Sequence, residues 1–376
     1  MIYFDNASTT EVCEDIKENL KDILDMYANP GSLHSFGFEC EKQVEKARKQ
    51  VAEAMGADKD TLYFTSGGTE ANNTAILGAA ERNKRRGKRV VTCLTEHPSV
   101  LESFHELERR GFEVIRLKVD EKGYIDKEEL KESINQETVL VSLMAVNNEY
   151  GTIQPIEELS RIVKEKNKDC LFHTDCVQAF GKEDINFPQV DLISISAHKI
   201  HALKGCGALY VKKGVNINNL HFGGQQERRL RPGTENTFGI FAFGRAAELL
   251  KDRQAQREHV LSVKKELLNI KQELEGVYVN GDEEKGSPYI LNISFENVKG
   301  EVLLHALEEK GIFVSTGAAC SSRAKEKKKT VDLLKEGRGA GAVRFSFSRY
   351  NTVEEATFCV GVLKEIIPFL REFVPR

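Results

Sequence analysis

The chain has 376 residues, of which 40% are hydrophobic and 30% are charged, and its net charge is −4. This balance is typical of a soluble globular enzyme of roughly two or three domains, and it excludes a disordered or fibrous protein. Because 54 Lys and Arg residues nearly balance 58 Asp and Glu residues, the overall charge indicates neither a nucleic acid nor an acidic membrane surface as partner.

The first two thirds of the chain alternate short apolar runs with charged segments of helical spacing. Helical spacing is clear in segments such as 100–110 and 156–166. Strands that alternate with helices indicate crossover connections, so we expect a buried, mostly parallel sheet with helices on both faces. The apolar runs, rich in β-branched residues, predict strands at 89–95, 139–146, 170–174, 192–196 and 207–211.

The final third has a different pattern, which predicts a second, smaller α+β domain with a mixed or antiparallel sheet. Residues 254–275 have the spacing of one long amphipathic helix. We place the boundary near 245–255 and assign residues 15–250 to the large domain, and 1–14 and 251–376 to the small one. Strands are predicted at 277–280, 290–295, 312–315 and 343–347, and further helices at 300–310 and 353–373.

We expect neither a secretory signal nor a membrane helix. The N-terminus has no basic segment followed by an apolar one, and no run approaches the roughly 18 apolar residues of a membrane span. The eight cysteines are scattered without a CxxC pair, which indicates reduced thiols and not a disulfide framework. We therefore expect a cytoplasmic protein, and we predict no metal site.

Two charged residues end predicted strands of the large domain. Lys199 closely follows the run 192–196, and ligands bind at the carboxyl ends of strands in an open α/β sheet. Desolvation there lowers the pKa of a lysine and suits it to Schiff-base chemistry. Asp175 ends the run 170–174, where a poorly solvated carboxylate faces a cation such as a protonated pyridine nitrogen. Asp175 also fits the cap of the next helix.

A glycine-rich turn, Phe64-Thr-Ser-Gly-Gly-Thr-Glu70, joins a predicted strand to the start of a helix. Backbone N–H groups around Gly68 and the helix dipole suit it to a phosphate, and Thr69 adds a hydroxyl group. The spacing of a Walker A motif is absent. His97 follows another predicted strand, where it either stacks on a flat ring, shuttles protons or only bonds locally.

These groups together match the requirements of pyridoxal 5′-phosphate. The aldehyde of this cofactor needs an amine, its ring nitrogen an acidic partner, its ring a flat neighbour and its phosphate a helix N-terminus. Lys199, Asp175, His97 and the glycine-rich turn supply these groups, all at strand ends of one predicted sheet. The combination therefore predicts a pyridoxal-phosphate enzyme.

The motifs, in this order, resemble those of the fold-type-I pyridoxal-phosphate enzymes of the class V aminotransferase superfamily. More narrowly, the chain resembles the NifS/IscS-like cysteine desulfurases over nearly its whole length. The most specific motifs are Ser194–Lys199 and Ser315–Cys320. The resemblance implies an α/β fold, with a mostly parallel seven-stranded sheet in the large domain and a smaller α+β C-terminal domain. It also implies conversion of L-cysteine to L-alanine, with the sulfur passing as a persulfide to an acceptor protein.

The resemblance implies a role for each residue around the cofactor. Lys199 would form the Schiff base and move the α-proton of the substrate, Asp175 would pair with the ring nitrogen, and His97 would stack on the ring. Gln178 would bond the phenolic oxygen of the ring. The phosphate would be held by Gly68, Thr69, Ser196 and His198, and by Thr234 of the neighbouring subunit of a homodimer.

The same resemblance assigns the residues that meet the substrate. Asn148 and Arg344 would bind the carboxylate of L-cysteine, and the planar fork of an arginine matches a carboxylate with two hydrogen bonds. Asn148 stands in Val146-Asn-Asn-Glu-Tyr-Gly151, which is also compatible with a simple turn. Cys320 would be the nucleophile that receives the sulfur. Only a thiolate reacts, so a local base or cation must assist, and His97 and the basic run 325–329 are candidates.

The destination of the sulfur is left open by the sequence. The segment after Cys320 lacks the Leu-Glu-Pro-Ser stretch common in the family and carries the basic run 325–329 instead. This run suits an acidic carrier protein or a tRNA-modifying enzyme, and equally a solvated loop, so iron–sulfur cluster assembly and tRNA or cofactor thiolation both stay possible. We expect no direct contact with nucleic acid.

Three alternative functions are compatible with parts of this pattern. A selenocysteine lyase or an aminotransferase of small amino acids would use the same scaffold, and an aminotransferase would not need Cys320. A catalytically silent scaffold that only binds partners would have lost Lys199 or Asp175, and both are present. Cysteine desulfuration is therefore the function that we expect.

Overall fold

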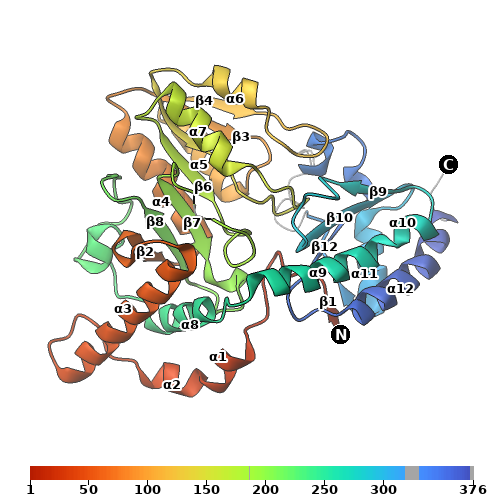
Figure 1. The fold of residues 1–376 in the computed structure, drawn as a ribbon, viewed down its shortest axis with the longest axis horizontal. Helices are drawn as coiled ribbons and strands as arrows, with labels where there is room; N and C mark the ends of the chain where they lie inside the picture. Colours follow the sequence, from red (N-terminus) through yellow and green to blue (C-terminus); the bar gives the residue numbers. More distant parts are fainter. Residues whose placement is uncertain (186, 318–329, 373–376) are drawn as a thin grey trace.

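The computed structural model describes residues 1–185, 187–317 and 330–372. Two lobes are visible in Figure 1, and helix α9 (Arg253–Leu268) runs from one to the other. The larger lobe contains a seven-stranded sheet and the smaller lobe a three-stranded sheet. None of the helices in the described ranges is long and apolar enough to cross a membrane. Cys320 and the basic run 325–329 lie outside the described residues.

The seven-stranded sheet is mostly parallel, as predicted. Only β8 runs antiparallel to its two neighbours, β2 and β7, and all other neighbouring strands are parallel. The parallel strands therefore end at one edge of the sheet. No apolar run marks β4, because this edge strand is partly exposed along most of its length. The order across the sheet is β2 (Leu62–Thr65), β8 (Gly207–Val211), β7 (Leu192–Ser196), β6 (Leu171–Asp175), β5 (Thr138–Ser142), β3 (Arg89–Cys93) and β4 (Glu113–Leu117).

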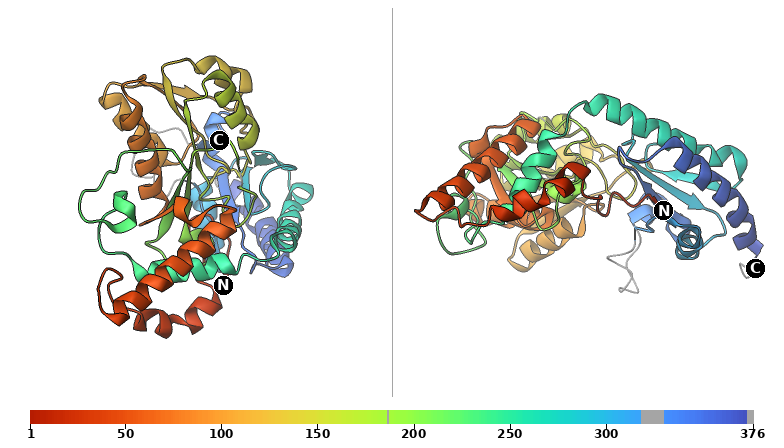
Figure 2. Two further views of the ribbon diagram at one scale, coloured as in Figure 1. Left: turned by 60° about the vertical axis from the view of Figure 1, so that its left-hand side comes forward. Right: turned by 90° about the horizontal axis from the view of Figure 1, so that it is seen from below.

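Helices cover both faces of this sheet, which Figure 2 shows nearly edge-on in its left view. Successive strand residues point to opposite faces, so Val91 and Ile193 pack into one core while Val90 and Leu192 pack into another. The first core is closed by α1 (Glu14–Glu18), α3 (Ser35–Met55), α6 (Lys127–Ser133), α7 (Ile156–Lys166) and α8 (Thr237–Glu248). The second core is closed by α4 (Gly68–Asn83) and α5 (Pro98–Arg109).

The smaller lobe contains the predicted antiparallel sheet, in the order β12 (Ala342–Ser346), β10 (Ile290–Phe295) and β9 (Val277–Asn280). Helices α9 and α12 lie side by side on it in Figure 2 (right). The prediction of one helix over 254–275 was wrong, because α9 ends at Leu268. Asn269, whose backbone N–H donates at 3.2 Å to the carbonyl oxygen of Glu266, three residues back, separates α9 from a short second helix. The remaining helices are α10 (Ile270–Glu273), α11 (Gly300–Glu309) and α12 (Val353–Glu372).

The N-terminal segment connects the two lobes. Strand β1 (Ile2–Tyr3) pairs with β11 (Ile312–Phe313), and Phe4 is buried in the core of the smaller lobe. A few residues later, the backbone N–H of Thr10 donates to the carbonyl oxygen of His198 at 3.0 Å. Residues 5–10 therefore cross from the small sheet to the end of β7, beside Lys199. Helix α2 (Leu20–Asp25) follows on the outside of the larger lobe.

The predicted reduced thiols are confirmed for the seven described cysteines. All seven are buried and unpaired: Cys13, Cys40, Cys93, Cys170, Cys176, Cys206 and Cys359. Burial raises the pKa of the thiols of Cys93, Cys170, Cys176 and Cys206, which lie in or next to strands of the large sheet, and of Cys359 in the smaller lobe, which keeps them protonated and unreactive.

Candidate active site

Lys199 lies in the short turn after β7, at the edge where the parallel strands end. Its side chain is only 9% exposed, and its Nζ donates to the backbone carbonyl oxygens of Ala7 and, at 2.7 Å, Ser8. Burial lowers the pKa of this amine to about 7, assisted by the positive charges of Lys182 and Arg344. A large fraction of Lys199 is therefore a neutral nucleophile near neutral pH.

Asp175, the last residue of β6, is buried and belongs to a hydrogen-bond network that reaches His97. Its Oδ2 accepts from Asn72 Nδ2 at 2.7 Å, and the same Nδ2 lies 2.9 Å from Ser99 Oγ. Ser99 Oγ in turn lies 2.8 Å from Nδ1 of His97. Asp175 Oδ1 also accepts from the backbone N–H of Val177 at 2.9 Å, but the described residues between β6 and β7 form turns and no helix, so the expected helix cap is not observed. One carboxylate oxygen thus orders the turn and the other faces the network.

His97 is the N-cap residue of α5, where its ring nitrogen accepts from the backbone N–H of Ser99 at 3.1 Å. The pKa of His97 lies below its ordinary value, mainly because the ring is buried. The negative charge of Asp175 partly offsets this effect, and the positive charge of Lys199 adds to it. Each of these charges acts on His97, which indicates that the ends of β3, β6 and β7 bring the three residues together. In the neutral imidazole that results, Nδ1 is the acceptor and Nε2 carries the hydrogen, so His97 offers a flat uncharged ring.

The glycine-rich turn opens helix α4 directly beside these residues. Gly67 has a φ of 153°, a conformation that favours glycine, and a Cβ on Gly68 would lie 2.6 Å from the side chain of Val177. Thr69 is exposed in the first turn of α4, where the first N–H groups of a helix have no partner within the helix. This geometry suits an anion at the helix N-terminus.

Ser196 and His198 flank the same turn. The hydroxyl group of Ser196 is buried and has no hydrogen-bond partner in the part of the chain that the structure describes. His198 Nδ1 lies 3.1 Å from Thr9 Oγ1, and burial together with nearby lysines lowers its pKa to about 4. A buried polar atom without a partner is rare in proteins, so the Ser196 hydroxyl group points to a missing ligand.

Arg344 belongs to β12 of the smaller lobe but is buried against the N-terminal segment and the larger lobe. Its Nη2 donates to Asp5 Oδ1 at 2.8 Å and to Ser8 Oγ at 2.7 Å. Its Nη1 donates to the backbone carbonyl oxygen of Asn148 at 2.9 Å and lies 3.6 Å from Glu149. The Nε atom is buried without a partner among the described residues. Arg344 and Asn148, the two residues predicted to bind the carboxylate, are therefore in contact, but Arg344 bonds to the backbone of Asn148 and not to its side chain.

The segment that leads to Cys320 begins at this point. Ser315 exchanges two backbone hydrogen bonds with Arg344, and a Cβ on Gly317 would lie 2.0 Å from a carboxylate oxygen of Glu149. Gly317 is the last residue described before Cys320. The chain thus enters the cysteine segment beside the residues predicted to bind the substrate.

Pyridoxal phosphate fits the residues that are present. The buried neutral amine of Lys199 can capture an aldehyde, and the Asp175 carboxylate offers a partner for a ring nitrogen. The unpartnered hydroxyl group of Ser196 and the open start of α4 suit a phosphate. Gln178 lies next to Lys199, since its Nε2 donates at 2.8 Å to the same carbonyl oxygen of Ala7. Thr234 is not part of these contacts and is exposed on the loop before α8.

Several residues of this site were not expected from the sequence. Asn72 and Ser99 connect Asp175 to His97, Asp5 binds Arg344, and Lys182 lies beside Gln178. A weak signal existed for two of them, because Asn72 lies one turn after the glycine-rich turn and Ser99 two residues after His97. Asp5 stands in Tyr3-Phe-Asp-Asn-Ala-Ser-Thr-Thr10, one of the motifs shared with the family, but neither it nor Lys182 was assigned a role, because their partners depend on the way distant segments meet.

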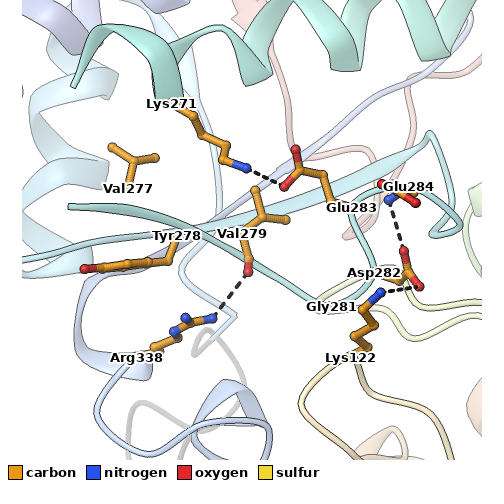
Figure 3. Close-up of a pocket in the computed structure, with 10 residues that line it drawn as sticks. All are labelled: Lys122, Lys271, Val277, Tyr278, Val279, Gly281, Asp282, Glu283, Glu284 and Arg338. Atoms are coloured by element: carbon orange, nitrogen blue, oxygen red, sulfur yellow. Dashed lines mark hydrogen bonds and ion pairs between the residues drawn. The ribbon is translucent and has the colours of Figure 1, made fainter. Parts of the chain in front are cut away.

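A separate pocket of about 520 Å³ lies on the smaller lobe and contains none of these residues (Figure 3). Two of its three basic side chains are paired with acidic ones, Lys271 with Glu283 at 2.6 Å and Lys122 with Asp282 at 3.6 Å. The guanidinium group of Arg338 lies over the ring of Tyr278, 4.9 Å from its centre. The three basic side chains of the lining are matched in number by three acidic ones, Asp282, Glu283 and Glu284, so the lining has no formal net charge.

Comparisons with known proteins agree with this site. A family model described as Aminotransferase class-V matches residues 2–357. A protein named Cysteine desulfurase IscS from Dictyoglomus turgidum is 41% identical, over 100% of this chain and 96% of that protein. The NifS/IcsS protein homolog of Lactobacillus delbrueckii subsp. bulgaricus is 40% identical, over 97% of each. A solved structure titled NIFS-LIKE PROTEIN is 37% identical, covers 98% of this chain and 99% of that chain, and has a TM-score of 0.91. The chain belongs to the class-V aminotransferase family of pyridoxal-phosphate enzymes and, within it, to the cysteine desulfurases of the NifS and IscS group.

Proposed function

We propose that this chain removes the sulfur of L-cysteine, leaves L-alanine and carries the sulfur as a persulfide on Cys320. The observation that supports this most directly is the buried amine of Lys199, with a pKa of about 7, beside the carboxylate of Asp175 and the guanidinium group of Arg344. This arrangement suits a reaction that starts from an amino acid, because it offers an amine base and a carboxylate-binding cation in one pocket.

Pyridoxal phosphate would be held by Lys199, Asp175, Gln178, His97 and the phosphate ligands Gly68, Thr69, Ser196 and His198. When bound, it draws electrons from the carbon that bears the amino group of the substrate. The neutral amine of Lys199 then accepts the α-proton and returns it, while Arg344 and Asn148 hold the carboxylate. Because burial lowers the pKa of His97, its ring is neutral at neutral pH and would stack on the ring of the cofactor, while the lowered pKa makes it a weak base for the Cys320 thiol.

The sulfur transfer balances without an added oxidant. The thiolate of Cys320 attacks the sulfur of the substrate, an S–S bond forms, and the C–S bond breaks with its electron pair left on carbon. A proton then adds to that carbon, which gives alanine. The net change converts cysteine and a thiol into alanine and a persulfide, and an acceptor protein removes the terminal sulfur.

We further propose a cytoplasmic homodimer, in which Thr234 of one subunit reaches the phosphate of the other. Thr234 is exposed, and Arg231 of the same loop donates to Glu70, next to Thr69, at 3.0 Å. Large apolar side chains on the larger lobe are also exposed, which is typical of an interface. They include Tyr27, Leu33, Phe38 and Phe222. For the domains, we propose residues 15–250 as the large one, and 1–14 and 251–376 as the small one that carries the cysteine segment.

The test is an anaerobic assay of alanine and sulfide from L-cysteine with the cofactor-loaded protein and dithiothreitol. The wild type, Cys320→Ser and, as a control at a core thiol, Cys359→Ala are compared. We expect equal amounts of both products from the wild type and from Cys359→Ala, and neither product from Cys320→Ser. Activity on amino acids that survives in Cys320→Ser would instead indicate an aminotransferase. Selenide release from selenocysteine without sulfide release would indicate a selenocysteine lyase.

A further inference from the structure

A second lysine reaches the pocket of Lys199 through a chain of hydrogen bonds. Nζ of Lys182 donates to Oε1 of Gln178 at 3.4 Å, and Nε2 of Gln178 donates to the carbonyl oxygen of Ala7 at 2.8 Å. Nζ of Lys199 donates to that same carbonyl oxygen. One amide side chain and one backbone carbonyl group therefore connect the two ammonium groups.

The position of Lys182 determines which way the Gln178 amide points. An ammonium group can only donate hydrogen bonds, so it must face the oxygen of the amide and not its nitrogen. The NH₂ group of Gln178 is then directed to Ala7 and to the side of Lys199. Without Lys182, the oxygen end of the amide would lose this protein partner, and only the bond to Ala7 would hold the amide in this orientation.

The positive charge of Lys182 is not neutralised by an ion pair in the described ranges of the chain. Glu183, the next residue, directs Oε1 to Arg257 and, at 3.2 Å, to Ser287. The ammonium group of Lys182 instead lies over the ring of Tyr289, 5.6 Å from its centre. Burial lowers the pKa of Lys182 to about 8, so the group is still mostly protonated at neutral pH.

The electrostatic environment of Lys199 contains charges of both signs. Lys182 and Arg344 disfavour a second positive charge, whereas Asp5 and Asp175 favour it. The titratable rings around the pocket, those of His97, His198 and His201, all have pKa values below the ordinary 6.5, because each is buried. These three rings are neutral at neutral pH. The charges that act on Lys199 are therefore the positive ones of Lys182 and Arg344 and the negative ones of Asp5 and Asp175.

We propose that Lys182 is a positioning residue for Lys199: its ammonium group holds the Gln178 amide in one orientation, and its charge favours the neutral, nucleophilic form of the Lys199 amine. A cation next to a buried lysine is a known means of activating that lysine toward carbonyl groups. The inference rests on the proposed function, because it assigns Lys182 to the capture of the aldehyde of pyridoxal phosphate. Lys182 need not touch the substrate or the cofactor.

The experiment measures the pKa of Lys199 directly in the full chain after removal of the cofactor. Trace acetic anhydride labels only neutral amines, and mass spectrometry quantifies the Lys199 peptide over a range of pH. The variants are Lys182→Met, which removes the charge, and Lys182→Arg, which keeps it. Lys264→Met is the control, since Lys264 is also a buried lysine with a lowered pKa, of about 8, but bonds to Ser287 in the smaller lobe.

We expect the labelling midpoint of Lys199 to rise by about one pH unit in Lys182→Met. It should stay at the wild-type value in Lys182→Arg and Lys264→Met. An unchanged midpoint in Lys182→Met overturns the proposal, and so does an equal rise in Lys182→Arg, which would indicate a merely structural role. If circular dichroism shows that Lys182→Met is unfolded, Lys182→Gln decides, with the same expected rise.

The sulfide assay of the wild type is run beside the labelling, so that two failures can be told apart. A shifted midpoint without sulfide release would overturn the proposed function and leave the role of Lys182 intact. Sulfide release with an unshifted midpoint would overturn the role of Lys182 alone.

Discussion

Nη2 of Arg344 donates to Oδ1 of Asp5 across 2.8 Å, although 339 residues separate the two in the sequence. The contact joins the N-terminal segment to β12 and lies beside Lys199, whose Nζ donates to Ala7 and Ser8 of the same segment. These contacts fix the orientation of the guanidinium group and leave its Nε without a partner among the described residues. The N-terminal segment is therefore part of the site, although it contains none of the residues to which the family resemblance assigned a role.

The Asp5–Arg344 contact predicts a change in substrate binding. Asp5→Asn should raise the KM for L-cysteine about tenfold, equivalent to about 1.4 kcal/mol, because the guanidinium group loses its charged anchor. The value of kcat should change much less, since Asp5 does not reach the reacting carbon. Steady-state kinetics of Asp5→Asn test this, with Glu108→Gln as the control for an exposed carboxylate–arginine pair with Arg116. An unchanged KM in Asp5→Asn would show that Arg344 is oriented without Asp5.

The low pKa of Lys199 predicts the pH dependence of cofactor capture. The neutral amine attacks the aldehyde, and its fraction rises as the pH increases through about 7. The rate of pyridoxal phosphate uptake by the cofactor-free chain should therefore rise to half its plateau near pH 7, and Lys199→Met should show no uptake signal. Stopped-flow absorbance measures this rate. A midpoint near the ordinary lysine value of 10.5 would contradict the burial argument.

The lowered pKa of Lys199 also predicts how the free energy of unfolding depends on pH. The folded pKa of Lys199, about 7, lies below the unfolded value of 10.5, so the unfolded chain binds more protons between these values. The free energy of unfolding of the wild type, relative to that of Lys199→Met, should therefore rise with pH from about 7 upward. Urea titrations at several pH values provide this difference. A flat difference would mean that Lys199 titrates alike in both states.

His173 predicts a loss of stability in acid that is independent of the active site. It is fully buried in β6 between Ser142 Oγ at 2.7 Å and Ser194 Oγ at 2.9 Å, and burial lowers its pKa to about 3. As the pH falls below 6.5, the unfolded chain takes up a proton that the folded chain refuses, which removes about 1.4 kcal/mol of stability per pH unit. His173→Gln should lack this dependence, whereas His105→Gln, at an exposed histidine of α5, should keep it. Urea titrations from neutral to acidic pH measure the slopes.

The ion pair of Arg48 and Glu227 predicts a large effect of a single substitution. Both side chains are buried, with Nη2 of Arg48 2.8 Å from Oε1 of Glu227, and Glu227 also accepts from the backbone N–H of Phe64 at 2.9 Å. Arg48→Met leaves the Glu227 charge without its partner and should lower the free energy of unfolding by about 3–5 kcal/mol. The double variant Arg48→Met, Glu227→Leu should recover part of this loss in urea titrations. If the double variant is as unstable as the single one, the loss in free energy of unfolding comes from lost packing of the Arg48 side chain and not from the unpaired charge of Glu227.

Much of the secondary structure could be predicted because strand formation depends on local pattern. The predicted runs 192–196, 207–211, 277–280 and 290–295 coincide with observed strands. The first, second and fourth are mostly buried apolar runs, whereas 277–280, at the edge of its sheet, has buried residues at both ends and more exposed ones between them. The edge strand β4 and the break after Leu268 could not be predicted in this way. Exposure on one side weakens the apolar pattern of an edge strand, and a single Asn does not distinguish a break from a continuous helix.

The sequence by itself determined the chemical groups and the strand ends at which they lie: an amine at Lys199, a carboxylate at Asp175 and a glycine-rich turn before α4. These follow from short segments, because residue type and turn chemistry act within a few residues along the chain. Only the tertiary structure decided the partners, with Asn72 on Asp175, Asp5 on Arg344 and Lys182 on Gln178. A buried polar group bonds to whatever the packing of distant segments brings within reach, and no local pattern encodes that meeting.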